Sequence, residues 1–444
     1  MKLVDHSVKR TLFSMALPML VGTISMNAYN LADTWYVSRL GTIPLAAMGF
    51  TFPVVMLFTF VAGGIGTGIT ALTSHAIGRS DKTSGSRIVT HGVMFMLMFA
   101  VVLSVVGYCT IDSVFTRLGA NTEVFPYIQR YMSIWYLGAV TMIFPMTGNG
   151  ILIAMGDSKS ASLFMATGAI LNCILDPIMI YGWLGFPAMG IAGAALATVI
   201  AQFIAALWLF YLLTCKHKLL HLAHPDLSLF MTNIRKILGF AIPGSLSMML
   251  MPISAAVITS LISRHGNGAV AAASAAGRVE MFAFVIPMAL GMSLMPFISQ
   301  NFGANRMDRI FQAKRYAMNF AFIYGIVIAG VFFIVAPAMA RIFTKDTAVA
   351  EIFIMYVRTV SFGYGMMEIH RYCGFMMTGM HKPVYATLLN MVRVLVLLIP
   401  LSYLGSSLWG IRGIFLGRLV TDIVAGGVGL VWIGILIQRK MIVK

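Results

Sequence analysis

Residues 45–72 read LAAMGFTFPVVMLFTFVAGGIGTGITAL, a run of apolar and small residues that contains no charged side chain. A helix of about 20 residues crosses the roughly 30 Å hydrocarbon layer of a bilayer, so this run is long enough to span it. Similar runs recur along the whole chain. The alternating segments of about ten residues that are typical of membrane β-barrels are not seen. The pattern therefore predicts an α-helical protein that crosses the membrane many times.

The composition of the whole chain points the same way. Of the 444 residues, 59% are hydrophobic and 10% are charged, whereas a soluble globular chain carries about 25% charged residues. The net charge of +17 could suggest nucleic acid, but the basic residues lie between apolar runs at alternate connections, which argues against that class of partner. The four cysteines form no CxxC pair, so we expect neither a disulfide framework nor a metal cluster.

Twelve membrane spans can be placed on the chain. They cover residues 12–36, 45–72, 88–111, 128–154, 161–183, 189–213, 236–262, 269–297, 316–340, 352–378, 384–404 and 411–437. One set of connections holds 19 Lys and Arg residues and the opposite set holds 5. Because cytoplasmic loops carry the excess of basic residues, we expect both termini in the cytoplasm.

The two halves of the sequence repeat one another. Shifting the second half by 225 residues aligns Ser38-Arg39-x-Gly41 with Ser263-Arg264-x-Gly266, and near the end a shift of 220 aligns Gly190 with Gly410. Six spans in each half make the repeat parallel, with its axis along the membrane normal. We therefore predict an all-α polytopic membrane protein with 12 transmembrane helices in two six-helix lobes related by pseudo-twofold symmetry.

The predicted boundaries follow from this repeat. They give an N-lobe at 1–215, a cytoplasmic linker at 216–234 and a C-lobe at 235–444. The linker holds His217, His221 and His224, and a solvated connection is a plainer interpretation than a metal site. Folds with parallel repeats typically move by rocking one half against the other around a central site. Pro18, early in the first helix, should bend that helix.

Acidic residues inside the N-terminal spans carry the most functional information. An acid at the centre of a span costs about 2.5–3.5 kcal/mol, so it usually lines a polar cavity or an ion path. Asp33 in span 1 follows Tyr29 by one turn, and Asp176 in span 5 follows Asn172 by one turn. Thr198 in span 6 lies at a compatible depth. The oxygen-rich set suits Na⁺, while mutual repulsion of the two carboxylates would equally make one of them a proton carrier.

The C-terminal half carries a different set of charges. The repeat partners of Asp33 and Asp176 are Ile258 and Val396, so the predicted cation site belongs to the N-terminal half alone. Charged residues in the C-terminal spans include Arg278, Glu280, Glu368, Arg371, Arg393, Arg418 and Asp422. For Glu280 and Glu368, structural pairing and contact with a substrate are both open, whereas the spacing of Arg418 and Asp422 favours a pair within one helix.

These residues resemble the multidrug and toxic compound extrusion (MATE) family along the whole chain. The motifs that carry the resemblance are Ala16-Leu17-Pro18 with Asp33, Gly78-Arg79, Asn172-x-x-x-Asp176-Pro177, Gly190-x-x-Gly193-Ala194-Ala195-x-Ala197-Thr198 and Gln300-Asn301-Phe302-Gly303-Ala304. The resemblance implies a monomeric exporter that exchanges amphipathic, often cationic small molecules for inward-moving H⁺ or Na⁺. It implies no organic cofactor, no nucleic acid and no enzymatic activity, and a location in the cytoplasmic (inner) membrane of a prokaryote.

The resemblance also implies roles for individual residues. Positions matching Asp33, Asn172, Asp176 and Thr198 form the N-lobe cation site of prokaryotic members, with Na⁺ as one candidate ion. Tyr29 would line the N-lobe cavity, and Pro18 would be a bending point. Some relatives carry a cation-binding acid in span 7, which this chain lacks. Glu280 and Glu368 do not match that acid but are candidate substitutes for it. They are also candidate residues of a substrate cavity.

Two other functions are alternatives to export. A lipid-linked glycan or lipid flippase of the same superfamily usually has fourteen spans and a basic central cavity, whereas this chain has twelve predicted spans and an acidic pair. A membrane-embedded enzyme would need a catalytic signature, and the sequence shows no nucleophile elbow, HExxH, phosphate loop or metal-spaced cluster.

Overall fold

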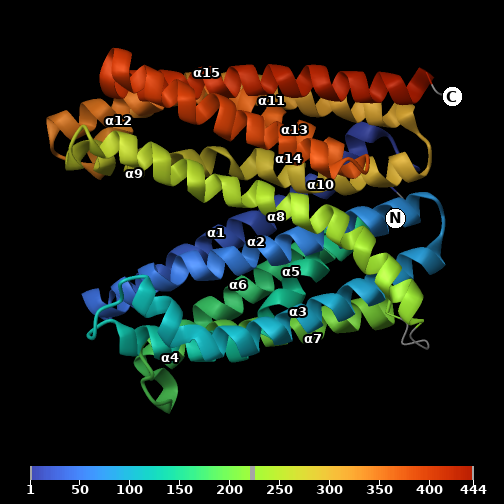
Figure 1. The fold of residues 1–444 in the computed structure, drawn as a ribbon, viewed down its shortest axis with the longest axis horizontal. Coiled ribbons are helices and arrows are strands. Elements are labelled where there is room, and N and C mark those ends of the chain that lie inside the picture. The colour runs from blue at the N-terminus through green and yellow to red at the C-terminus, as the bar shows by residue number, and fades with distance from the viewer. Residues whose placement is uncertain (1–2, 221–225, 443–444) are drawn as a thin grey trace. The chain divides into compact units, whose positions relative to one another are not determined.

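The computed structural model describes residues 3–220 and 226–442, and within these ranges it is helical without a β-strand. The first half of the chain (Figure 1) forms α1 (Val8–Ser38), α2 (Thr42–Gly78), α3 (Lys82–Arg117), α4 (Phe125–Leu137), α5 (Ala139–Ala154), α6 (Ser158–Tyr181), η1 (Trp183–Gly185), α7 (Ile191–Tyr211) and η2 (Leu212–Lys216). The second half forms α8 (Leu227–Ser263), α9 (Asn267–Ala283), α10 (Val285–Gly303), α11 (Met307–Phe343), α12 (Thr347–Val360), η3 (Ser361–Gly363), α13 (Tyr364–Gly379), α14 (Pro383–Met391), η4 (Val392–Leu398) and α15 (Ile399–Ile442).

The described helices combine into the twelve predicted membrane spans. Nine helical stretches are long and apolar enough to cross a bilayer, and α4 with α5, which are bent by 57° relative to each other, make a tenth. The short helices α12 and α13 together provide another span. The stretch Pro383–Lys440 contains two spans, because the backbone leaves helical geometry at Trp409 and Gly410.

The sequence repeat extends to the conformation of the backbone between helices. Gly41 and Gly266, 225 residues apart, precede α2 and α9 with φ angles of 116° and 97°. Gly190 and Gly410, 220 residues apart, have φ/ψ of 59°/−133° and 60°/−136°. Residues with a side chain rarely adopt these conformations, whereas glycine does so freely. The repeated glycines therefore mark the same turns in both halves.

The chain divides into two compact units. Unit 1 contains Leu17–Ser245, and unit 2 contains Leu3–Ala16 with Leu246–Lys444. Both boundaries fall inside helices, so α1 and α8 each contribute residues to both units. The first residues are bound within unit 2, where Leu3 N–H donates to Gln300 Oε1 at 2.9 Å and the Arg309 guanidinium donates to the Leu3 carbonyl at 3.1 Å.

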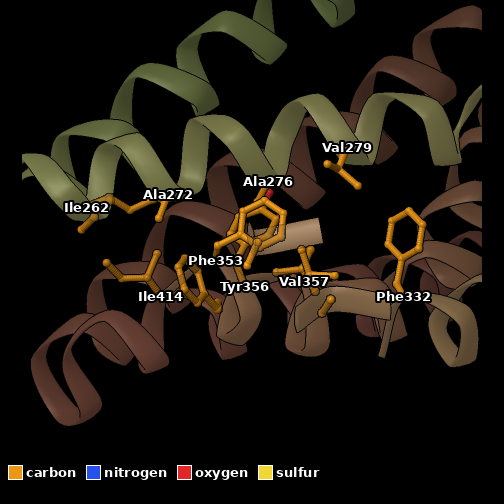
Figure 2. Packing of buried hydrophobic residues seen from close by; sticks show 14 of the residues in the cluster. Ile262, Ala272, Ala276, Val279, Phe332, Phe353, Tyr356, Val357 and Ile414 are labelled. Atoms are coloured by element: carbon orange, nitrogen blue, oxygen red, sulfur yellow. The ribbon is translucent and has the colours of Figure 1, made fainter. Parts of the chain in front are cut away.

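Small residues let the helices of unit 2 pack closely. One face of α9 carries Ala272, Ala276 and Val279, which point toward Phe353 and Tyr356 of α12 (Figure 2). In a bilayer the hydrophobic effect does not drive apolar helices together, because lipid is as apolar as they are. Helices then associate through close van der Waals packing, which small side chains allow. The packing fixes the rotation of α9 and therefore decides which of its residues lie in the core and which stay exposed.

Candidate functional site

The acidic pair predicted from the sequence lies within unit 1, on α1 and α6. Asp176 is fully buried, and Asp33, on the neighbouring span, is partly exposed. The two carboxylates are close enough for their charges to interact. Helix α6 stays helical through Pro177 and continues to Tyr181, so Asn172 and Asp176 remain one turn apart on the same face.

An amide connects the acid on α6 to α7. In the amide orientation that satisfies both neighbours, Asn172 Nδ2 donates to Asp176 Oδ2 at 2.9 Å and Asn172 Oδ1 accepts from Thr198 Oγ1 at 3.1 Å. Asn172 is buried and Thr198 is half-buried. Such a bridge holds the Asp176 carboxylate in one rotamer, because both ends of the amide are used. The structure thus brings three of the four predicted cation-site residues into one hydrogen-bonded chain.

The remaining oxygens of the pair have no partner among the described residues. Asp33 Oδ1 and Asp176 Oδ1 are both buried without a hydrogen bond, and neither carboxylate forms a salt bridge with a described residue. Burial of an ionised carboxylate without a counter-charge costs far more than burial of a neutral acid. The arrangement therefore favours the arrival of a positive charge, either a proton on one carboxylate or a small metal cation shared by oxygen atoms.

Two tyrosines complete the surroundings of the pair. Tyr29 lies one turn before Asp33, and its hydroxyl lies near the Thr198 side chain. Tyr131 of α4 interacts electrostatically with Asp33, Asp176 and Tyr29. The sequence interpretation did not include Tyr131 in the site, although the 225-residue repeat pairs it with Tyr356. That pairing is the signal that could have identified it, because Tyr356 also contacts a buried acid.

The acids of unit 2 are paired with arginines. Tyr356 donates to Glu280 Oε2 at 2.7 Å, and the Arg418 guanidinium contacts both Glu280 and the Tyr356 hydroxyl. Arg418 Nε also lies 4.0 Å from Asp422 Oδ2. The within-helix pair of Arg418 and Asp422 is therefore present, but it is one edge of a larger network that joins α9, α12 and α15.

Two further arginines of unit 2 at membrane depth neutralise acids in the same way. Arg393 Nη2 lies 2.7 Å from Asp422 Oδ1, and Arg371 Nη1 lies 3.0 Å from Glu368 Oε1 on the same helix. Glu368 and Asp422 are almost fully buried. Glu280 and Glu368 are thus held in ion pairs within unit 2, and a role for either in substrate binding stays a prediction.

Pro18 lies two residues past the point where α1 passes from unit 2 to unit 1. A proline inside a helix leaves the carbonyl one turn earlier without its donor and weakens the helix there. Its own carbonyl accepts a hydrogen bond from Ser162 Oγ of α6, so the residue is tied to the helix that carries Asp176. The predicted bending at Pro18 stays a prediction. Of the three linker histidines, His217 contacts Asp157, while His221 and His224 lie outside the described residues.

Comparison with known proteins gives consistent matches over the whole chain. The family model MatE matches residues 18–178 and 243–404. An FAD transporter from Shewanella oneidensis is 33% identical over 424 residues, which cover 96% of this chain and 94% of that protein. The multidrug export protein MepA from Staphylococcus aureus is 24% identical over 426 residues, covering 94% and 91%.

Solved structures agree with the described fold. A crystal structure of a mutant of the MATE transporter VcmN from Vibrio cholerae matches with a TM-score of 0.92 and 28% sequence identity, covering 97% of both chains. The matched regions of the family model, one in each half, correspond to the internal repeat. The similarity therefore extends over both halves of the chain and is not restricted to one of them.

Proposed function

Since the chain belongs to the MATE family of multi-pass membrane transporters, we propose that it is a secondary active exporter that exchanges amphipathic small molecules for inward-moving H⁺ or Na⁺. In this mechanism the protein alternates between states open to either side of the membrane, works as a monomer in the cytoplasmic membrane and has both termini in the cytoplasm. Multidrug export proteins among its relatives support a broad substrate range, in which we include organic cations.

The observation that carries the proposal is the buried acid pair of unit 1. Asp33 and Asp176 interact electrostatically, and each has a carboxylate oxygen without a donor. One incoming cation would neutralise part of this charge and pull α1 toward α6, because the two acids belong to different helices. Asn172 and Thr198 would position Asp176, and Tyr29 and Tyr131 would supply hydroxyls. A ligand that binds one state better than the other shifts the population toward it, which is the requirement for coupling.

The coupling ion follows from which cation the pair accepts. Carboxylate, amide and hydroxyl oxygens are suitable ligands for a hard metal cation, and two repelling carboxylates equally suit a shared proton. Efflux from proteoliposomes with an imposed Na⁺ gradient, and separately with an imposed pH gradient, distinguishes the two ions. An organic cation dye serves as the transported probe. Absence of efflux under both gradients, for every substrate tried, would contradict the proposed function.

The replacement Asp33→Asn tests the site itself. It preserves shape but removes the charge that attracts the cation, so we expect gradient-driven dye efflux to fall to background while the purified protein keeps its melting temperature. Asp112→Asn is the matched control, because Asp112 is an exposed acid on α3 of the same unit and should keep full activity. Wild-type efflux by the Asp33→Asn variant would remove the acid pair from the mechanism.

A second candidate substrate class is favoured by a specific similarity. The FAD transporter shares 33% identity with this chain, compared with 24% for MepA at similar coverage. We therefore include flavin nucleotides, which are phosphate-bearing anions with an aromatic ring, as candidate cargo. Parallel efflux assays with FAD and with the cationic dye in the same vesicles separate the two classes. Transport of dye without FAD would favour multidrug export, and the reverse would favour a nucleotide exporter.

A further inference from the structure

One arginine of unit 2 at membrane depth has no hydrogen bond, ion pair or ring contact among the described residues. Arg358 of α12 also lacks an acidic partner, but it donates to the Phe333 carbonyl at 3.0 Å. The pairs described above engage Arg371, Arg393 and Arg418. For Arg278 of α9, by contrast, the structure gives no hydrogen bond, ion pair or ring contact among residues 3–220 and 226–442. Glu280, two residues further on, points to the buried side and is held by Arg418 and Tyr356, so it is not available to Arg278.

The position of Arg278 along the span makes this exposure unusual. It lies eleven residues after the first residue of α9, which is roughly 16 Å along the helix axis at about 1.5 Å per residue. That distance is near the middle of a hydrocarbon layer of roughly 30 Å, too deep for full escape of the side chain to either surface. Arginines at such depth face a bundle interior or a water-filled cavity rather than lipid.

The packing of α9 leaves room for a ligand at this point. The core face of the helix is occupied by Ala272, Ala276 and Val279, which point toward α12 (Figure 2). Arg278 lies on the other face and is exposed, as is Ser274 one turn earlier. A methyl group built on Gly277 would meet no atom within 4 Å. The guanidinium therefore stands on an open surface beside a hydroxyl.

We propose that Arg278 faces the water-accessible transport path and binds the phosphate of an anionic substrate, with Ser274 as a second donor. The fork of a guanidinium matches a phosphate in two parallel hydrogen bonds. The surplus positive charge of unit 2 at membrane depth complements such a group, in contrast to the acid pair of unit 1. The inference rests on the proposed function as an exporter and specifies one class of its substrates.

The test compares three flavins that share the isoalloxazine ring. FAD and FMN carry phosphate and riboflavin does not, so efflux of each is measured in proteoliposomes with wild-type protein and the Arg278→Gln variant. We expect FAD and FMN efflux to fall roughly ten- to hundredfold, the loss typical of a charged hydrogen bond, while riboflavin and dye efflux stay unchanged. Arg278→Lys should restore part of the FMN efflux. Arg412→Gln, an exposed arginine on α15, is the matched control.

Several outcomes would overturn the inference while leaving the proposed function intact. One is wild-type efflux of dye with no efflux of FAD or FMN. Another is an equal loss of all substrates in Arg278→Gln, which would indicate a structural role. A loss that appears only in vesicles containing anionic lipid would show that the bound phosphate belongs to a lipid headgroup. Failure of the wild-type protein to export any probe would instead contradict the proposed function itself.

Accessibility of the position is measured separately. In a variant without the four native cysteines, Arg278→Cys should react with a membrane-impermeant thiol reagent. Ser274→Cys in the same background keeps Arg278, and added FMN should slow its reaction. Ile326→Cys is the matched control, because Ile326 is an exposed apolar residue in the middle of α11 and should remain unlabelled in lipid. Equal labelling of both positions, or none at residue 278, would remove Arg278 from a water-accessible path.

Discussion

The acids of unit 1 and those of unit 2 occupy related helical frames but have opposite surroundings. Buried carboxylate oxygens without a donor occur in both units, on Asp33 and Asp176 and also on Glu368 and Asp422. Asp33 and Asp176, however, form no salt bridge with a described residue. Glu280, Glu368 and Asp422 each lie within 4 Å of an arginine. An acid that already has a fixed arginine gains little from a mobile cation, whereas an acid without one gains a great deal. This difference is the basis for proposing that unit 1 exchanges ions while unit 2 keeps its acids paired with arginines.

The repeated tyrosines make the comparison more direct. Tyr131 and Tyr356 stand at equivalent positions of the repeat, and each lies beside buried acids. In unit 2 the tyrosine hydroxyl contacts an acid and an arginine, and in unit 1 the tyrosine interacts electrostatically with two acids. The helical frame supplies the same hydroxyl in both places, and the neighbouring charges decide its use.

The largest expected effect comes from breaking the network of unit 2. Arg418→Met leaves Glu280 and Asp422 without one partner, and breaking a buried ion pair from one side typically costs about 3–5 kcal/mol. We expect a clear drop in the melting temperature of the detergent-purified protein. The double variant Arg418→Met with Glu280→Met should recover much of it, because both charges are then absent.

Arg412→Met is the control for this experiment, since Arg412 lies on the same helix and is exposed. An unchanged melting temperature in Arg418→Met would contradict the view that unit 2 depends on its ion pairs for stability. The ion pairs of unit 2 would then contribute little to stability, despite the contacts that the structure shows.

A smaller effect separates the two tyrosines. Tyr356→Phe removes the donor to Glu280 Oε2 and should cost about 1–3 kcal/mol, the penalty for an unsatisfied buried acceptor. It should lower the melting temperature more than it lowers efflux. Tyr131→Phe should do the reverse, raising the cation concentration needed for half-maximal efflux with little change in stability. If Tyr131→Phe lowered mainly the melting temperature and Tyr356→Phe mainly the efflux, the roles proposed for the two units would have to be exchanged.

The smallest effect concerns an acid of unit 1 outside the membrane spans. Asp157 begins α6, where it accepts from His217 Nε2 at 3.1 Å and from Lys216 Nζ at 2.7 Å. The hydrogen bonds from His217 and Lys216 hold the pKa of this carboxyl well below its ordinary range. A depressed carboxyl pKa stabilises the fold above the unfolded-state value of about 3.9, and the gain is lost as the pH falls below it.

Asp157→Asn should therefore lower stability at neutral pH slightly, by about 0.2–1 kcal/mol for a partly exposed ion pair, and reduce the loss of stability on acidification below pH 4. Melting temperatures from pH 3 to pH 8 measure this. Asn is itself a good residue for a helix start, and Asp81→Asn at the start of α3 controls for capping. An unaltered acid profile would contradict the ion-pair contribution.

The sequence by itself determined the membrane class, the number of spans and the repeat, because apolar run length and spacing are local properties of the chain. It also marked Asp33, Asn172, Asp176 and Thr198 as polar groups at compatible depths. A hydrogen bond between Asn172 and Thr198, on neighbouring helices, could not be read from spacing, since it depends on how the two helices are rotated against each other.

Only the tertiary structure decided which charges meet. Arg418 was assigned to Asp422 one turn away, and the structure adds Glu280, 138 residues distant in sequence, because α9, α12 and α15 pack together. The same packing buries one face of α9 and leaves Arg278 on the other. The sequence shows which residues are charged. Whether a charge is neutralised depends on distances between helices, and side-chain packing across the whole unit sets those distances.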